Sequence, residues 1–128
     1  MKRSRLFAFI FFCIILFGFS STSFSQTVTF CESVDDNGNP SGTSTVFNVH
    51  SGGGYLYVLV NGISNSKHVT YVIFYNDKFS TVLSQDTQTD WTICWKKITF
   101  YDAGEYSIKV YDGSDKYVAT GYLTIKYY

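Results

Sequence analysis

The sequence has little proline and no excess of charge of either sign. Its 128 residues include one proline, and ten Lys and Arg residues balance ten Asp and Glu residues. With 45% hydrophobic and 20% aromatic residues, the chain does not have the composition of a disordered linker. Because there is no net positive charge, the chain has no long-range attraction for nucleic acid or for an anionic membrane. These features predict one folded domain that binds no nucleic acid.

The sequence also lacks an apolar run long enough for a transmembrane helix. The longest such run spans only residues 6–19, whereas a membrane-spanning helix needs about 20 residues. Three basic residues precede this run and small side chains follow it, which is the layout of a signal peptide. We predict a signal peptide over residues 1–25 and a mature domain over residues 26–128. This predicts a secreted or periplasmic protein, with the cell surface included, and no membrane span after cleavage; an uncleaved signal anchor is the alternative.

Cysteine is scarce, and its placement leaves one pair in the mature domain. Of the three cysteines, Cys13 lies in the predicted signal peptide, so Cys31 and Cys94 remain. An even pair in an oxidising compartment predicts one structural disulfide. Two buried free thiols and a bond to a partner chain are the alternatives. The spacing does not decide between them, because a disulfide requires Cα atoms within about 7 Å.

The short motifs of common catalytic and metal sites are missing. His50 and His68 are the only histidines, and no Gly-x-Ser-x-Gly sequence accompanies them. The cysteines and histidines also lack the close spacing of zinc ligands. We therefore predict no enzyme, no metal and no cofactor. A calcium loop at 35–39 is the alternative to an ordinary turn, although the full calcium-loop spacing and its final Glu are missing.

What the sequence does contain is a series of short β-strand patterns. Val, Ile, Thr, Tyr and Phe recur in runs separated by Gly, Asn, Asp and Ser. The predicted strands cover residues 27–33, 44–50, 55–61, 68–76, 79–83, 91–100, 105–112 and 117–127. Seven or eight strands at this spacing predict an all-β antiparallel sandwich or barrel. The apolar pattern shifts across Lys96 and Lys97, which predicts a β-bulge there.

One segment carries a resemblance to a known fold family. Asp102-Ala103-Gly104-Glu105-Tyr106 resembles the tyrosine corner of immunoglobulin-like domains, and a hairpin turn follows at 112–116. The chain is similar to the disulfide-poor immunoglobulin-like and fibronectin-like modules of secreted bacterial proteins. Ile108 stands where an antibody domain has its second cysteine. The resemblance implies an immunoglobulin-like β-sandwich of seven to eight strands, with structural roles for Asp102, Gly104 and Tyr106.

Eleven tyrosines are the most suggestive feature for function. If the relevant strands share one sheet, its outer face gathers a tyrosine cluster that binds a protein or a glycan. The candidate binding residues are Tyr55, Tyr57, Tyr71, Tyr75, Tyr111 and Tyr122. The alternative is that tyrosine simply suits half-buried strands. In contrast, the strand from Val69 to Tyr75 is apolar on both faces, which predicts a central or covered position.

We therefore expect a secreted, non-catalytic binding or interaction module. The alternative function is a structural subunit that assembles through its edge strands. Residues 117–128 form a long final strand, and only Lys116 and Lys126 supply charges that would block pairing there.

Overall fold

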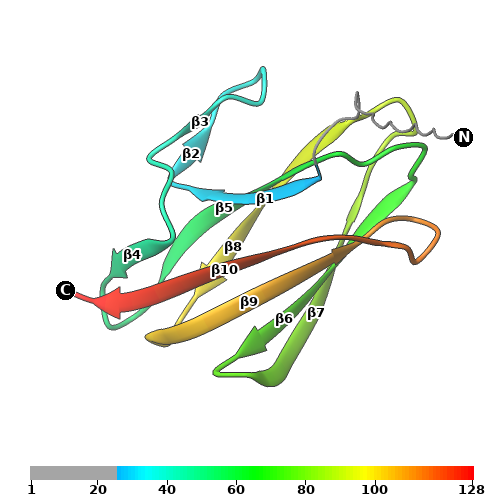
Figure 1. Ribbon diagram of the computed structural model, residues 1–128. Helices are drawn as coiled ribbons and strands as arrows, with labels where there is room; N and C mark the ends of the chain where they lie inside the picture. Colours follow the sequence, from blue (N-terminus) through cyan, green and yellow to red (C-terminus); the bar gives the residue numbers. More distant parts are fainter. Residues whose placement is uncertain (1–25) are drawn as a thin grey trace, which may run out of the picture.

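The computed structural model describes residues 26–128, which form strands and turns and contain no helix (Figure 1). The predicted signal peptide at 1–25 lies outside the described residues. The strands are β1 (Thr27–Cys31), β2 (Ser33–Val34), β3 (Pro40–Ser41), β4 (Val46–Val49), β5 (Gly54–Asn61), β6 (His68–Tyr75), β7 (Lys78–Asp86), β8 (Ile93–Phe100), β9 (Gly104–Tyr111) and β10 (Tyr117–Tyr127). The all-β prediction is confirmed. Over residues 26–128, no helix is long and apolar enough to cross a membrane.

Two sheets form the sandwich. The three-stranded sheet has the order β1-β5-β8, and the five-stranded sheet has the order β4-β10-β9-β6-β7. All neighbours in these sheets are antiparallel except β4 and β10, which run parallel. Figure 1 shows β4 beside the end of β10, and the short β2-β3 hairpin beyond β1.

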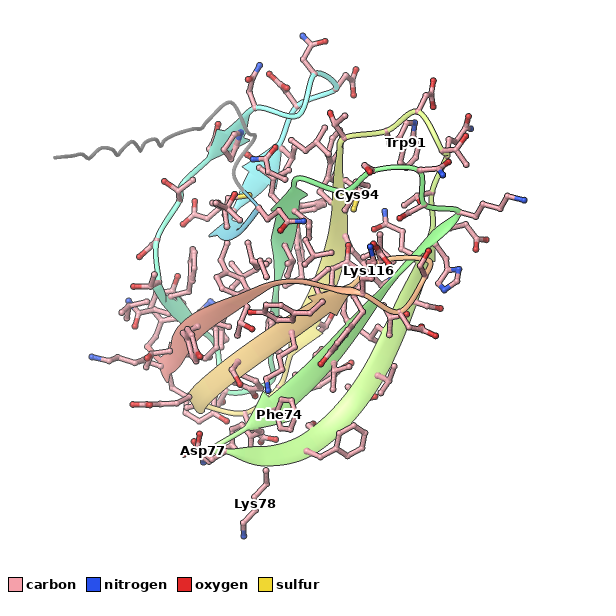
Figure 2. The ribbon with its side chains drawn as sticks, turned by 45° about the vertical axis from the view of Figure 1, so that its right-hand side comes forward. Phe74, Asp77, Lys78, Trp91, Cys94 and Lys116 are labelled. Atoms are coloured by element: carbon pink, nitrogen blue, oxygen red, sulfur yellow. The ribbon has the colours of Figure 1, made fainter. Side chains whose placement is uncertain are left out.

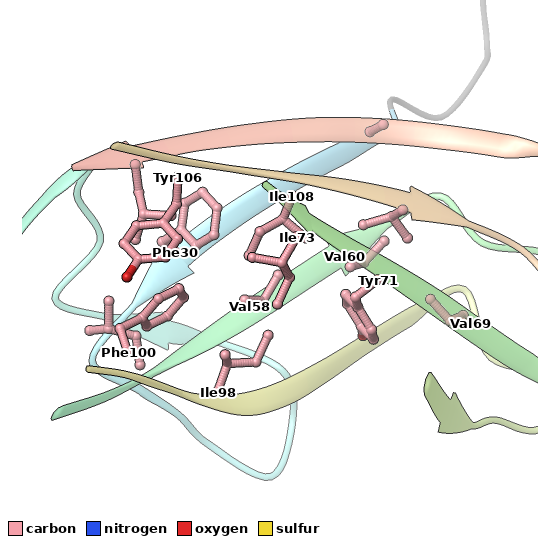
Figure 3. Packing of buried hydrophobic residues seen from close by; sticks show 14 of the residues in the cluster. Phe30, Val58, Val60, Val69, Tyr71, Ile73, Ile98, Phe100, Tyr106 and Ile108 are labelled. Atoms are coloured by element: carbon pink, nitrogen blue, oxygen red, sulfur yellow. The ribbon is translucent and has the colours of Figure 1, made fainter. Parts of the chain in front are cut away.

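The core lies between the two sheets and is built by alternate residues of each strand. Val58 and Val60 point inward from β5, and Ile108 and Val110 point inward from β9. Figure 3 shows Val58, Val60 and Ile108 meeting from both layers, with the Tyr71 ring among them. Because side chains alternate between the two faces of a strand, the residues between them face outward.

The β2-β3 hairpin covers part of the outer face of the three-stranded sheet. Cys31 and Leu59 point to this outer face, yet both are buried. Gly38 in the hairpin turn has a φ of 84° and packs against the ring of Trp95, which faces the same way. A Cβ atom on Gly38 would lie 3.3 Å from that ring. Glycine therefore allows the hairpin to pack closely on this face.

The turn before β9 forms as the sequence predicts. The Tyr106 hydroxyl donates a hydrogen bond to the carbonyl oxygen of Asp102 at 2.7 Å. Gly104 has a φ of 150°, which disfavours any side chain. The Tyr75 ring fills the space where a Gly104 side chain would lie, and its hydroxyl donates to the Ala103 carbonyl oxygen at 2.6 Å.

The predicted bulge at Lys96 and Lys97 is wrong. β8 pairs with β5 in a continuous register from Ile93 to Phe100. Lys96 lies opposite Val58 and so lies on the core side of the strand. It is half-buried at the open side of the sandwich, beside β7. The flexible stem of lysine allows its charge to reach solvent from such a position, so no bulge is needed.

Candidate functional site

The predicted disulfide between Cys31 and Cys94 is wrong, because both residues are free thiols. β5 separates β1 from β8, so the two backbones are at least two inter-strand spacings, about 9.6 Å, apart. This exceeds the reach of a disulfide. The side chains also point to opposite faces of the sheet, since Cys31 pairs with outward-facing Tyr57 and Cys94 pairs with inward-facing Val60. Burial raises the pKa of both thiols.

The predicted tyrosine cluster is divided among three environments. Tyr55 and Tyr57 lie on the outer face of the three-stranded sheet, where Lys97 Nζ sits 4.0 Å from the centre of the Tyr55 ring. Tyr71 is fully buried, and Tyr75 packs against the core. The prediction that these residues share one outer face is therefore wrong.

Tyr71 belongs instead to a polar network inside the core. Its hydroxyl donates to Gln85 Oε1 at 2.7 Å and lies 3.6 Å from Cys94 Sγ. Gln85 in turn donates from Nε2 to the Trp95 carbonyl oxygen at 2.7 Å. Burial raises the pKa of Tyr71, with the neighbouring Cys94 adding to the effect. The network joins β6, β7 and β8 and satisfies polar groups that burial would otherwise leave unpaired.

Tyr111 and Tyr122, in contrast, both lie on the outer face of the five-stranded sheet, and the strand register places other large side chains beside them. Three rows of paired residues run across this face. The rows are Tyr122-Ser107-Phe74-Phe79, Thr120-Lys109-Val72-Val82 and Tyr117-Tyr111-Thr70-Ser84. We name the apolar and aromatic residues of these rows, together with Lys109, the aromatic face.

The aromatic face is exposed to solvent, and its rings contact one another in pairs. Phe79 is 63% exposed and Tyr122 is 70% exposed. Phe74 and Phe79 meet edge to face at 6.3 Å between ring centres, and Tyr111 and Tyr117 meet similarly at 6.0 Å. Figure 2 shows Phe74 toward the β6-β7 turn, where Asp77 and Lys78 lie. Aromatic pairs of this geometry hold each other's orientation, so these rings are positioned by their neighbours.

Lys109 is the only charged side chain among the residues of the three rows. Its Nζ lies 5.4 Å from the centre of the Phe74 ring, within the range of a cation–π contact. The aromatic face therefore offers one positive charge surrounded by apolar and hydroxyl-bearing side chains.

The sequence did not identify Val72, Phe74, Phe79, Val82 or Tyr117 as members of a site. The apolar pattern of 69–75 on both strand faces was the available signal, and it predicted either a central strand or a covered outer face. β6 is indeed central, between β9 and β7. In the structure Val72 and Phe74 are half-buried by their neighbours within the sheet, and the adjoining Phe79 and Val82 are exposed.

Asp35 and Asp112 use their carboxylates within the acidic turns themselves. Asp35 Oδ1 accepts backbone N–H groups of Asn37 and Asn39, both at 2.9 Å, and Oδ2 accepts the Asn39 side-chain amide at 3.2 Å. The hydrogen bond from the Asn39 backbone is the main reason that the pKa of Asp35 is lowered. Asp112 accepts two backbone N–H groups in the same way. Within residues 26–128, no three His, Cys, Asp or Glu side chains gather in a way that would hold a metal ion.

The histidines lie on different parts of the molecule. His50 stacks on Tyr128 with 4.6 Å between ring centres, and His68 begins β6.

The chain matches no protein-family model and no curated protein sequence.

Proposed function

We propose that the protein is a secreted, non-catalytic recognition domain of the immunoglobulin-like class, which binds a protein partner through the aromatic face. The strand arrangement supports the fold family. In immunoglobulin-like domains strands A, B and E share one sheet, and C, F and G share the other, to which C′ can be added. Here β1, β5 and β8 correspond to the first set, and β6, β9, β10 and β7 to the second. The Tyr106 hydrogen bond stands at the start of the strand that corresponds to F.

The exposed aromatic face is the observation that carries the proposed function. Soluble proteins rarely leave large contiguous apolar patches open to water, and such patches mark interaction sites. Tyr and Phe are enriched at protein interfaces because they supply a large rigid contact area. Here Phe79, Val82, Tyr117 and Tyr122 are all exposed on one side of one sheet.

The chemistry of the aromatic face favours a protein partner over a glycan. Its three rows contain no carboxylate or amide side chain to orient sugar hydroxyls. Lys109 provides one central cation instead. A partner surface that places an Asp or Glu carboxylate within an apolar surround would complement it.

For the alternative function, assembly through edge strands, β10 is a poor candidate because part of its outer edge is already paired. β10 pairs with β9 on one side, and its residues Thr124 to Tyr127 pair with β4 on the other. The edge strands of this sheet are the short β4 and β7, and β7 carries Lys78 and a bulge at Ser80. Lysine and bulges on an edge strand oppose pairing with another chain. These features support recognition through a face rather than assembly through an edge.

The test is a binding measurement on surface variants. A partner isolated by cross-linking the protein to secreted and envelope proteins of its source is purified, and its dissociation constant is measured by calorimetry. We expect Phe79→Ser, Tyr122→Ala and Lys109→Glu each to weaken binding by about 30-fold, as central interface residues do. Tyr55→Ala, on the opposite sheet, is the control and should leave binding unchanged. The proposal fails if Tyr55→Ala removes binding while the three face variants retain it.

A further inference from the structure

A concave surface lies apart from the aromatic face, between the β2-β3 turn and the loop that joins β7 to β8. The groove has a volume of about 580 Å³, a size typical of small-ligand sites. Asp36 and Asn37 line one wall, and Asp90 and Trp91 line the other. Figure 2 shows Trp91 on the loop, with Cys94 below it at the start of β8.

Hydrogen bonds and packing fix both walls of the groove. On one side, Asp35 holds the turn by accepting the backbone N–H groups of Asn37 and Asn39, and Gly38 rests on the Trp95 ring. On the other side, the backbone N–H of Trp91 donates to the Gln88 carbonyl oxygen at 3.0 Å. The Thr92 carbonyl oxygen accepts the backbone N–H of Gly62 at 2.9 Å. A site whose walls are already in place loses less entropy when it binds a ligand.

The side chains that face the groove combine an aromatic ring with hydrogen-bonding groups that have no partner among the described residues. Trp91 is 39% exposed, which leaves indole surface free for stacking. The carboxylates of Asp36 and Asp90 and the amide of Asn37 are exposed and make no side-chain hydrogen bond within residues 26–128. No Lys or Arg lines the groove, so its charge repels anions.

We infer that this groove is a binding site for a neutral saccharide. The apolar face of a pyranose ring would stack on the Trp91 indole, because a large flat aromatic surface suits a ring of similar size. Sugar hydroxyls would donate to the carboxylates of Asp36 and Asp90, and the Asn37 amide would supply both a donor and an acceptor. The site does not depend on the aromatic face, which belongs to the other sheet.

Two measurements on the intact secreted protein test this inference. The probes are soluble polysaccharides: laminarin, xylan, mannan, pullulan and glycol chitin, with alginate and polygalacturonate as anionic controls. Affinity electrophoresis reports binding, and acrylamide quenching of tryptophan fluorescence reports whether the ligand covers the groove, because Trp91 and Trp95 both line it. We expect at least one neutral polysaccharide to retard migration and to reduce quenching, and the anionic ones to do neither.

Variants assign the binding to the groove. Trp91→Ala should weaken retardation at least tenfold, Trp91→Tyr should retain most of it, and Asp36→Asn with Asp90→Asn should weaken it further than either alone. Tyr122→Ala on the aromatic face is the matched control and should bind like the unaltered protein. Urea unfolding of Trp91→Ala checks that this variant is folded. Trp91→Tyr tests the same position with an aromatic ring still present.

Four results would overturn the inference. One is the absence of retardation by every neutral polysaccharide. Another is retardation that Trp91→Ala leaves unchanged, and the third is a preference for the anionic probes. A loss of saccharide binding in Tyr122→Ala but not in Trp91→Ala would place the saccharide on the aromatic face and would also overturn it. Loss of protein binding in the aromatic-face variants does not bear on this site.

Discussion

The hydroxyl of Tyr106 donates to the carbonyl oxygen of Asp102 at 2.7 Å, so a side chain of β9 fixes the turn that leads into that strand. The ring also packs on Phe100 at 4.9 Å and on Tyr75 at 5.0 Å between ring centres. Burial raises the pKa of Tyr106, which keeps the hydroxyl protonated as the donor. This one residue therefore joins the turn, the end of β8 and β6.

The first prediction concerns that hydrogen bond. Tyr106→Phe keeps the ring packing but leaves the Asp102 carbonyl oxygen without its donor, so we expect a loss of about 1–3 kcal/mol of unfolding free energy. Urea unfolding followed by circular dichroism measures this. Tyr111→Phe, whose ring lies on the outer face, should change stability by no more than about 0.5 kcal/mol. Equal and negligible effects of the two substitutions would contradict the role of the corner.

The second prediction concerns the glycine of the same turn. Gly104→Ala places a methyl group 2.6 Å from Tyr75 Cε1 at a φ of 150°, so both contact and backbone strain oppose it. We expect the unfolding free energy to fall by more than about 1 kcal/mol, because alanine is destabilising where the backbone requires a positive φ. Gly52→Ala is the matched control, because nothing lies within 4 Å of a Cβ there. A Gly104→Ala protein as stable as Gly52→Ala would show that the turn tolerates a side chain.

Local patterns allowed part of this structure to be predicted. The strand class follows from residue types and turn signals, and the corner is a contact between residues four positions apart. The sheet in which each strand lies depends on pairing between distant segments, so the sequence did not show that Tyr55 and Tyr111 face opposite sides. Tyr71 was misplaced because both faces of β6 are apolar and the alternation gives no direction. The Cys31–Cys94 disulfide prediction failed because pairing between distant segments places β5 between the two cysteines, which the sequence did not show.

The third prediction concerns thiol accessibility. Both cysteines are buried and free, so we expect neither to react with a thiol reagent in the folded protein within minutes, and both to react after unfolding in guanidinium chloride. Intact-mass measurement after alkylation counts the modified thiols under each condition. Unfolded, non-reduced protein that takes up no alkyl group would establish a disulfide and contradict the structure.

The last prediction follows from the direction of the thiol pKa values. In the unfolded chain a cysteine ionises near pH 8.5, whereas burial raises the pKa of Cys94 in the folded protein. Above about pH 8.5 the unfolded state therefore releases a proton that the folded state keeps, and the folded state loses relative stability as the pH rises. We expect the unfolding free energy to be constant from pH 7 to 8 and to fall, partly on account of Cys94, as the pH rises from 8 to 9.5. Cys94→Ala is less stable at pH 7 because it leaves a cavity, but its decline between pH 8 and 9.5 should be smaller. Urea midpoints measured across this range separate the two effects, and an identical decline in both proteins would show that the Cys94 thiol does not titrate with unfolding.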